Sequence, residues 1–66
     1  MTITVNGQAK EAEAGINLSQ LLEQMQLNTA CVAVECNLEV IEREAFATTQ
    51  LSEGDSLEIV SFVGGG

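Results

Sequence analysis

The sequence predicts an α+β fold, in which a mixed, mostly antiparallel sheet of about five strands carries one main helix across one face. Three observations lead to this class: two short strand-like segments that each continue into a hairpin turn, one amphipathic helical stretch between them, and a strongly apolar segment near the end of the chain. The order is hairpin, helix, hairpin, short helix and strand. In a compact sheet the last strand returns beside the first as a parallel neighbour.

The first predicted element is a β-hairpin. Residues 1–5 alternate apolar and polar side chains, and Asn6-Gly7 supplies the positive φ values of a type I′ turn. The returning segment, residues 8–13, is weakly apolar and carries three charges. Such a segment is typical of a strand at the edge of a sheet.

The next predicted element is a helix that begins after an Asn17 cap and runs to about Leu27. Asn17 and Gln20 have the spacing of a capping box. Asn28 is the predicted stop, because asparagine tolerates the left-handed conformation that ends many helices. The apolar residues of the helix recur at i, i+3, i+4 and i+7 and form one stripe toward the core: Leu18, Leu21, Leu22 and Met25.

A second hairpin and a short helix follow. Residues 31–34 predict a buried strand, residues 35–38 its turn, and residues 40–41 a short return strand. After them a short α-helical or 3₁₀ segment is expected, with Phe46 packed inward. Arg43 in this segment is expected to pair with a nearby carboxylate.

The last strand, residues 57–63, is the most apolar segment and is therefore predicted to be central in the sheet. Leu57 and Ile59 lie on one of its faces, and Val60 and Phe62 on the other. This distribution predicts a bulge, or a strand buried on both faces.

Composition narrows the classes of function. The net charge is −8, with Lys10 and Arg43 as the only cationic side chains, so a basic protein surface is a better partner than nucleic acid. Histidine is absent, which removes the commonest general base and metal ligand. A domain this small has little surface to spare for a deep substrate pocket. We therefore expect no enzyme activity of its own, no bound cofactor and no metal.

The sequence also bears on the compartment. No apolar run is long enough to span a bilayer and no secretory signal is recognisable, so a cytoplasmic location is expected. The spacing of Cys31 and Cys36 fits neither a Cys-x-x-Cys redox pair nor a zinc site. Both are expected to be small hydrophobic side chains or inert thiols, not a disulfide.

The printed sequence ends in Val63-Gly64-Gly65-Gly66. Glycine lacks a Cβ, so such a segment passes through a narrow slot and leaves the α-carboxylate of Gly66 open to attack. The alternative interpretation is a frayed, solvated end. We predict a domain over residues 1–63 and a flexible glycine tail over residues 64–66.

The succession of these motifs resembles the ubiquitin-like β-grasp family and, within it, the thiamine-biosynthesis sulfur carriers of the ThiS family. The resemblance covers essentially the whole chain, but departs at Glu42 and Phe46, where the family often has proline and tryptophan, and in a third terminal glycine. It rests on these segments: Met1-Thr2-Ile3-Thr4-Val5-Asn6-Gly7, Leu21-Leu22, Val32-Ala33-Val34 with Asn37, Val40-Ile41-Glu42-Arg43-Glu44, Glu53-Gly54-Asp55 and the glycines.

What this resemblance implies is a protein substrate. An adenylating, E1-like partner would use ATP to convert the Gly66 carboxylate into an acyl-adenylate, and a persulfide donor would then displace AMP. The resulting thiocarboxylate would deliver its sulfur to a thiazole synthase. Gly64 and Gly65 would thread the tail into the partners' active sites, and the free protein would be a monomer without a membrane partner.

Four alternatives stay open. The small subunit of molybdopterin synthase uses similar chemistry, but its family is usually longer and richer in aromatic residues and proline. A protein-conjugating modifier is a third relative of the same fold. Asp55-Ser56-Leu57 is similar to the phosphopantetheine site of acyl carrier proteins, but there the serine opens a helix. The last alternative is an interaction domain with an idle tail.

Overall fold

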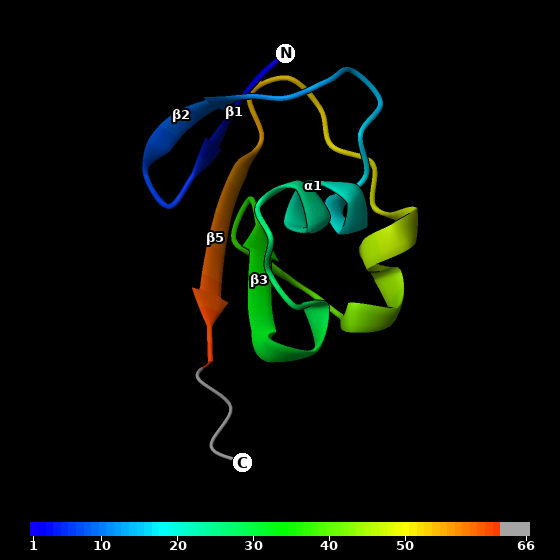
Figure 1. Cartoon of the computed structure of the whole chain (residues 1–66). Helices are drawn as coiled ribbons and strands as arrows, with labels where there is room; N and C mark the ends of the chain where they lie inside the picture. Colours follow the sequence, from blue (N-terminus) through cyan, green and yellow to red (C-terminus); the bar gives the residue numbers. More distant parts are fainter. Residues whose placement is uncertain (63–66) are drawn as a thin grey trace.

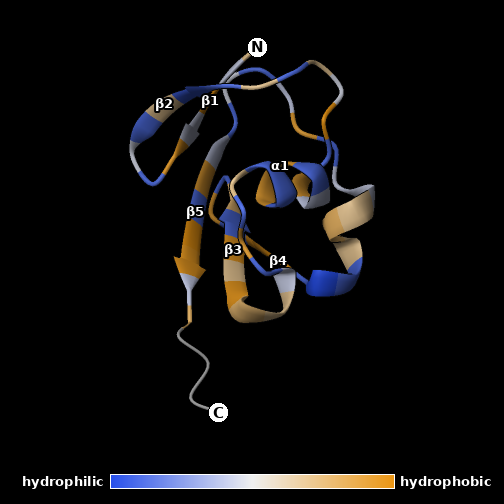
Figure 2. Ribbon diagram, viewed as in Figure 1, coloured by the Kyte–Doolittle hydropathy of each residue, from blue (hydrophilic) through white to orange (hydrophobic). Residues whose placement is uncertain are grey.

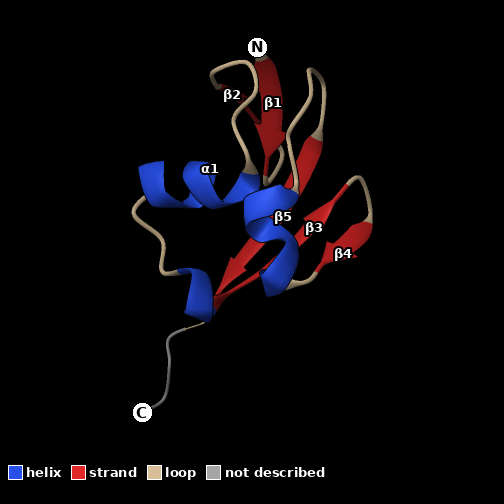
Figure 3. Ribbon diagram, turned by 90° about the vertical axis from the view of Figure 1, so that its right-hand side faces the viewer, coloured by secondary structure: helices blue, strands red, loops and turns tan. Residues whose placement is uncertain are grey.

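The computed structural model describes residues 1–62, which form one five-stranded sheet with helices on one side (Figure 1). The strand order is β2-β1-β5-β3-β4; β1 and β5 are parallel, and the other neighbours are antiparallel. Helix α1 runs across the strands (Figure 3). The elements in chain order are β1 Thr2–Val5, β2 Gln8–Glu11, α1 Leu18–Gln24, the 3₁₀ helix η1 Thr29–Cys31, β3 Val32–Cys36, β4 Glu39–Ile41, the 3₁₀ helix η2 Arg43–Thr48 and β5 Ser56–Ser61.

This architecture confirms the predicted fold class and the central place of the last strand. The first hairpin is also confirmed, since Asn6 and Gly7 have φ values of 50° and 82°, as a type I′ turn requires. β2 lies at the edge of the sheet as predicted but ends at Glu11. The predicted extension of β5 to residue 63 and the predicted glycine tail at residues 64–66 lie outside the described residues.

Helix α1 begins as predicted and ends differently. The Asn17 side chain accepts a hydrogen bond from the Gln20 amide (2.7 Å), and the Gln20 side chain accepts one from the Asn17 amide (3.0 Å), which completes the capping box. At the other end Gln26 takes the left-handed conformation (φ 60°), and the Leu27 amide donates to the Leu22 carbonyl (2.9 Å). The Gln26 amide also donates to the Glu23 carbonyl (2.9 Å), and the two bonds form a Schellman motif. The predicted stop at Asn28 is wrong: its side chain caps η1 instead.

The second hairpin is tighter than predicted. Cys31 belongs to η1, so β3 starts at Val32, and the turn is the pair Asn37-Leu38, with φ values of 52° and 72°. Phe46 in η2 is buried as expected. The prediction that Arg43 pairs with a carboxylate is wrong for residues 1–62, where the one ion pair joins the Met1 α-ammonium to Glu11. A long exposed side chain gains little from fixing its geometry for such a pair.

The core lies between α1 and the facing side of the sheet (Figure 2). The three leucines of the predicted stripe have no exposed surface, and full burial of one such side chain contributes about 1.5–3 kcal/mol. Met25 packs against the core from its rim. The buried residues are Ile3, Val5, Ile16, Leu18, Leu21, Leu22, Val32, Val34, Phe46, Leu51, Leu57 and Ile59.

Strand β5 buries only one of its faces. Leu57 and Ile59 point into the core, whereas Val60 and Phe62 are 58% and 54% exposed. The register with β3 is continuous from Cys36↔Leu57 to Val32↔Ser61. The predicted bulge or two-sided burial is therefore wrong. The helices cover one side of the sheet only, so the other face of β5 keeps its apolar side chains in contact with solvent.

Candidate functional site: the base of the glycine segment

The described part of the chain ends at Phe62, four residues before Gly66. Ser61 of β5 pairs with Val32, and the Phe62 amide donates a 2.7 Å hydrogen bond to the Cys31 carbonyl. The sheet therefore holds the chain up to Phe62, and Gly66 is the fourth residue beyond it. The predicted site residues Gly64, Gly65 and Gly66 lie outside the described residues, so their roles stay predictions.

Beyond Leu57, the β1 side of β5 is held by one side chain. β1 pairs with β5 only at Thr4↔Ser56 and Val5↔Leu57, and then turns away. Asn6, the next residue, accepts a hydrogen bond from the Ile59 amide at Oδ1 (2.7 Å) and donates from Nδ2 to the Ile59 carbonyl (3.1 Å). Its amide group thus replaces a peptide group of the missing strand and extends the ladder toward the chain end.

A second asparagine holds the start of β5. The Asn37 amide donates to the Ser56 carbonyl (2.8 Å), and Asn37 Oδ1 accepts from the Ser56 amide (3.0 Å). Asn37 Nδ2 also donates to Asp55 Oδ1 (3.1 Å), while Asp55 Oδ2 accepts from the Ser52 amide (2.8 Å). Ser56 therefore begins a strand, not a helix, which removes the basis of the acyl carrier interpretation.

The sheet face turned away from α1 carries apolar side chains in the open. Val40 is 69% exposed, Val60 58% and Phe62 54%. An open concavity of about 290 Å³ lies on this face, lined by Ala33, Val34, Glu35, Val40, Glu58 and Val60. Sequence reasoning missed this surface. The signal that could have found it is the even-numbered row Glu58, Val60 and Phe62, because a face that contains a glutamate is not a core face.

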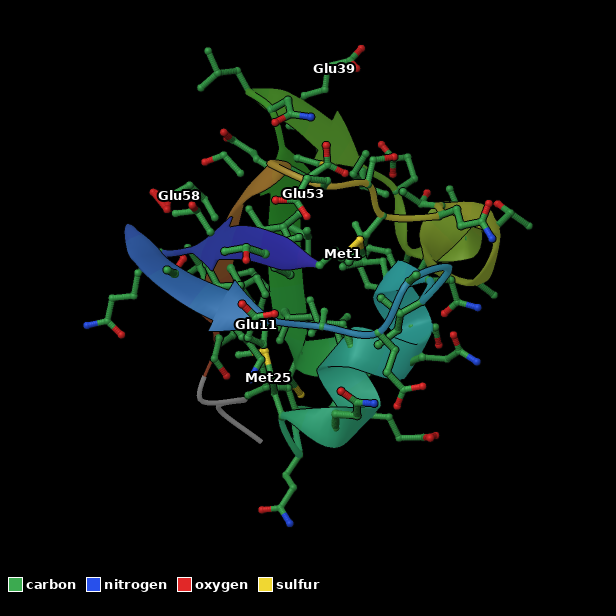
Figure 4. The ribbon with its side chains drawn as sticks, turned by 90° about the horizontal axis from the view of Figure 1, so that it is seen from above. Met1, Glu11, Met25, Glu39, Glu53 and Glu58 are labelled. Atoms are coloured by element: carbon green, nitrogen blue, oxygen red, sulfur yellow. The ribbon has the colours of Figure 1, made fainter. Side chains whose placement is uncertain are left out.

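Carboxylates dominate the charge of the molecule. The chain has ten acidic residues against two cationic side chains. Within the part that the structure describes, the single ion pair joins the Met1 α-ammonium to Glu11 (3.8 Å), at the β1–β2 edge of the sheet (Figure 4). Glu58 lies on the side away from the helices (Figure 4), and its cross-strand partner Glu35 shares that face. The outer face is therefore both apolar and negatively charged.

The two cysteines are free thiols, and both are half-buried. Burial raises the pKa of the Cys36 thiol above its ordinary value, and the nearby carboxylates of Asp55 and Glu39 raise it further. A raised pKa keeps the thiol protonated, and the protonated thiol is a poor nucleophile.

Over residues 1–62, no group of three or more His, Cys, Asp or Glu side chains is arranged to hold a metal ion. No helix in that span is long and apolar enough to cross a membrane.

The fold and the site define a class of protein. A five-stranded mixed sheet crossed by one helix, whose central strand leads to the end of the chain, is a ubiquitin-like β-grasp domain. Residues 3–66 match the ThiS family, and the chain belongs to that family. The resemblance drawn from the sequence motifs is therefore confirmed.

Solved structures agree with this assignment. The crystal structure of the thiamine biosynthesis protein ThiS from Geobacter metallireducens is 39% identical, covers 100% of both chains and superposes with a TM-score of 0.85. The solution structure of a thiamine biosynthesis protein from the same organism gives a TM-score of 0.81.

Sequence relatives include sulfur carrier proteins and thiazole synthases. The sulfur carrier protein ThiS of Escherichia coli K12 is 32% identical over 66 residues, which is the full length of both chains. Thiazole synthases of Paramagnetospirillum magneticum and Magnetococcus marinus are 36% and 41% identical over the whole of this chain. The chain spans only 20% of the length of each of these two proteins. In them a segment similar to this chain is part of a longer polypeptide.

Proposed function

We propose that this chain is the sulfur carrier for thiazole formation in thiamine biosynthesis, and that it acts as a protein co-substrate and not as an enzyme. The observation that carries the proposal is the anchoring of β5. The central strand pairs with β3 as far as Ser61, the Phe62 amide bonds to Cys31 of η1, and Asn6 fixes the strand from the other side. A glycine segment with such a base combines a rigid docking domain with a reactive end.

The chemistry requires a free α-carboxylate on Gly66. A carboxylate is a poor electrophile, so an adenylating enzyme first transfers AMP from ATP to a carboxylate oxygen and releases pyrophosphate. A persulfide sulfur then attacks the carbonyl carbon, and AMP leaves. Reductive cleavage of the resulting acyl disulfide by a thiol gives the thiocarboxylate. ATP belongs to the partner, and this chain itself needs no cofactor.

Gly64 and Gly65 supply the reach and slenderness that this chemistry needs. A side chain at either position would widen the segment that enters the partner's active site. Gly66 presents its carbonyl carbon without a neighbouring Cβ. The third glycine lengthens the reach by at most about 3.6 Å.

The relatives favour thiazole formation over molybdopterin formation as the destination of the sulfur. In two thiazole synthases a segment similar to this whole chain is joined to the rest of the protein in one polypeptide. Covalent linkage raises the effective concentration of one module near the other. Such fusions support a functional link between a ThiS-like domain and thiazole synthase.

Intact-mass spectrometry tests the proposal directly. The chain is incubated with the adenylating enzyme of the same organism, ATP, a persulfide donor and a reducing thiol. We expect one oxygen to be replaced by one sulfur at the C-terminus, and no change when ATP is omitted. A chain that lacks Gly66 should keep the wild-type melting temperature and lose sulfur loading by more than about 100-fold, because a shift of a few ångströms misplaces the reacting carbon.

Two results would contradict the proposal. One is an unmodified wild-type chain in a reaction where a known sulfur carrier is loaded by the same partners. The other is undiminished loading of the chain that lacks Gly66.

A further inference from the structure

Two carboxylates face each other on the outer side of the sheet. Glu35 of β3 is the direct cross-strand partner of Glu58 of β5, and both are exposed. Directly opposite residues have Cβ atoms about 4.5–5.5 Å apart, and like charges at that distance destabilise a sheet. Neither carboxylate forms an ion pair within residues 1–62. The free domain therefore contains a repulsive pair that an external cation would relieve.

The surroundings of this pair are apolar. Val40 of β4 lies directly opposite Glu35 on its other side, and Val60 and Ala33 form the pair two residues along the ladder toward Phe62. Val40, Val60 and Ala33 line the same concavity of about 290 Å³ as the two glutamates. An arginine or lysine side chain combines an apolar stem with a cationic head. Its stem would cover the valines while its head lies between the two carboxylates.

The position of the pair relative to Gly66 indicates what covers it. Gly66 is the fourth residue after Phe62, and four fully extended residues span at most about 14 Å. An enzyme that holds Gly66 in its active site must therefore lie against the end of β5. Glu58 is four residues before Phe62, about 13 Å along the strand. A typical interface buries about 800 Å² on each partner, which is wide enough to reach it.

We propose that this outer face is the docking surface for the thiazole synthase, and that Glu35 and Glu58 together receive an arginine or lysine side chain of that enzyme. The inference rests on the proposed function of Gly66, because that function brings the enzyme to the end of β5. Charge complementarity selects a cationic partner side chain, since the carrier has a net charge of −8. The thiazole synthases that contain a segment similar to this chain identify the partner class.

Isothermal titration calorimetry with the full chain and the thiazole synthase of the same organism tests the docking surface. The test variant is Glu35→Gln with Glu58→Gln. The matched control is Glu13→Gln with Glu23→Gln, two exposed glutamates on the helical side of the sheet: Glu23 belongs to α1, and Glu13 lies between β2 and α1. Both double variants remove two negative charges and keep the side-chain size.

We expect the test variant to bind the thiazole synthase about 10-fold or more weakly than wild type, with a shallower salt dependence. The control variant should bind within about twofold of wild type. The unfolding midpoint of the free test variant should equal or exceed that of wild type, because the substitutions relieve cross-strand repulsion. A loss of affinity in a more stable domain excludes misfolding as its cause.

The inference would be overturned if the wild-type chain did not bind the thiazole synthase, or if the test variant bound it with undiminished affinity. It would also be overturned if the test and control variants lost the same affinity for the thiazole synthase, or if the test variant lost affinity for the adenylating enzyme alone. Sulfur loading of the wild-type chain, followed by intact mass, reports separately on the proposed function. A wild-type chain that loads while the test variant binds normally disproves the docking surface alone. A wild-type chain that never loads disproves the proposed function.

Discussion

Replacement of Asn6 by glycine should release the central strand from its side-chain clamp. Glycine adopts the observed φ of 50° without strain, so Asn6→Gly removes the two hydrogen bonds to Ile59 and leaves the turn geometry unchanged. Each such bond contributes about 0.5–1.5 kcal/mol, and the added glycine freedom costs about 0.4–1 kcal/mol in the unfolded chain. We expect a total loss of about 2–3 kcal/mol in the free energy of unfolding.

This loss is large for a chain of 66 residues, whose total stability at about 0.05–0.15 kcal/mol per residue is about 3–10 kcal/mol. The midpoint of thermal unfolding should fall by about 8–20 °C. Urea unfolding followed by far-UV circular dichroism measures the change, and the urea m-value should stay constant. Native-state hydrogen exchange adds a local test, because the Ile59 amide should lose protection more than the other amides of β5.

A companion variant separates the hydrogen bonds from the backbone conformation. Asn6→Ala removes the same bonds but keeps a Cβ at the left-handed φ, without the local hydrogen bonding that makes asparagine tolerant of it, which costs about 1–2 kcal/mol relative to glycine. It should therefore be less stable than Asn6→Gly. If Asn6→Gly stays within about 0.5 kcal/mol of wild type and Ile59 exchange is unchanged, the clamp carries no stability and the reasoning fails.

Two further predictions concern the second hairpin and its cysteine. Leu38 has a φ of 72° and is 90% exposed. Leu38→Gly should therefore raise the free energy of unfolding, measured in urea melts, by about 1 kcal/mol. Leu38→Ala keeps the strained φ and should not raise it. Burial, Asp55 and Glu39 raise the pKa of Cys36, so the folded state favours the protonated thiol. The protonated thiol therefore contributes to the free energy of unfolding. This contribution is fully present below the ordinary thiol pKa of about 8.5 and is lost as the pH rises through the pKa of the folded state. Stability should therefore fall more steeply above about pH 8.5 in wild type than in Cys36→Ala, and parallel curves would refute the shift.

Local sequence signals determined most of the secondary structure. The Asn6-Gly7 turn and the Asn17–Gln20 capping box depend on residues within a few positions of one another. The leucine stripe of α1 follows from helical periodicity, and the apolar character of β5 predicted its central place. These features could be read from the chain because their physical causes are local or need only one buried face.

The sequence alone could not decide which of two local choices the rest of the fold favours. Both Gln26 and Asn28 could end α1. Gln26 takes the left-handed conformation, because the Leu27 amide can then donate to the Leu22 carbonyl and complete the Schellman motif. Arg43 has carboxylates near it in sequence, yet forms no ion pair within residues 1–62.

For the candidate site, too, one part could be predicted from the sequence and another depended on the tertiary structure. The sequence by itself indicated Gly66 as the reactive end, from the glycine run and the resemblance that followed. The tertiary structure decided how the strand that precedes it in sequence is held and which side chains lie on the uncovered face of that strand: Asn6 bonds to Ile59 across 53 positions, and Glu35 meets Glu58 on that face. Both contacts join residues far apart in the chain, and they arise only when β5 enters the sheet between β1 and β3.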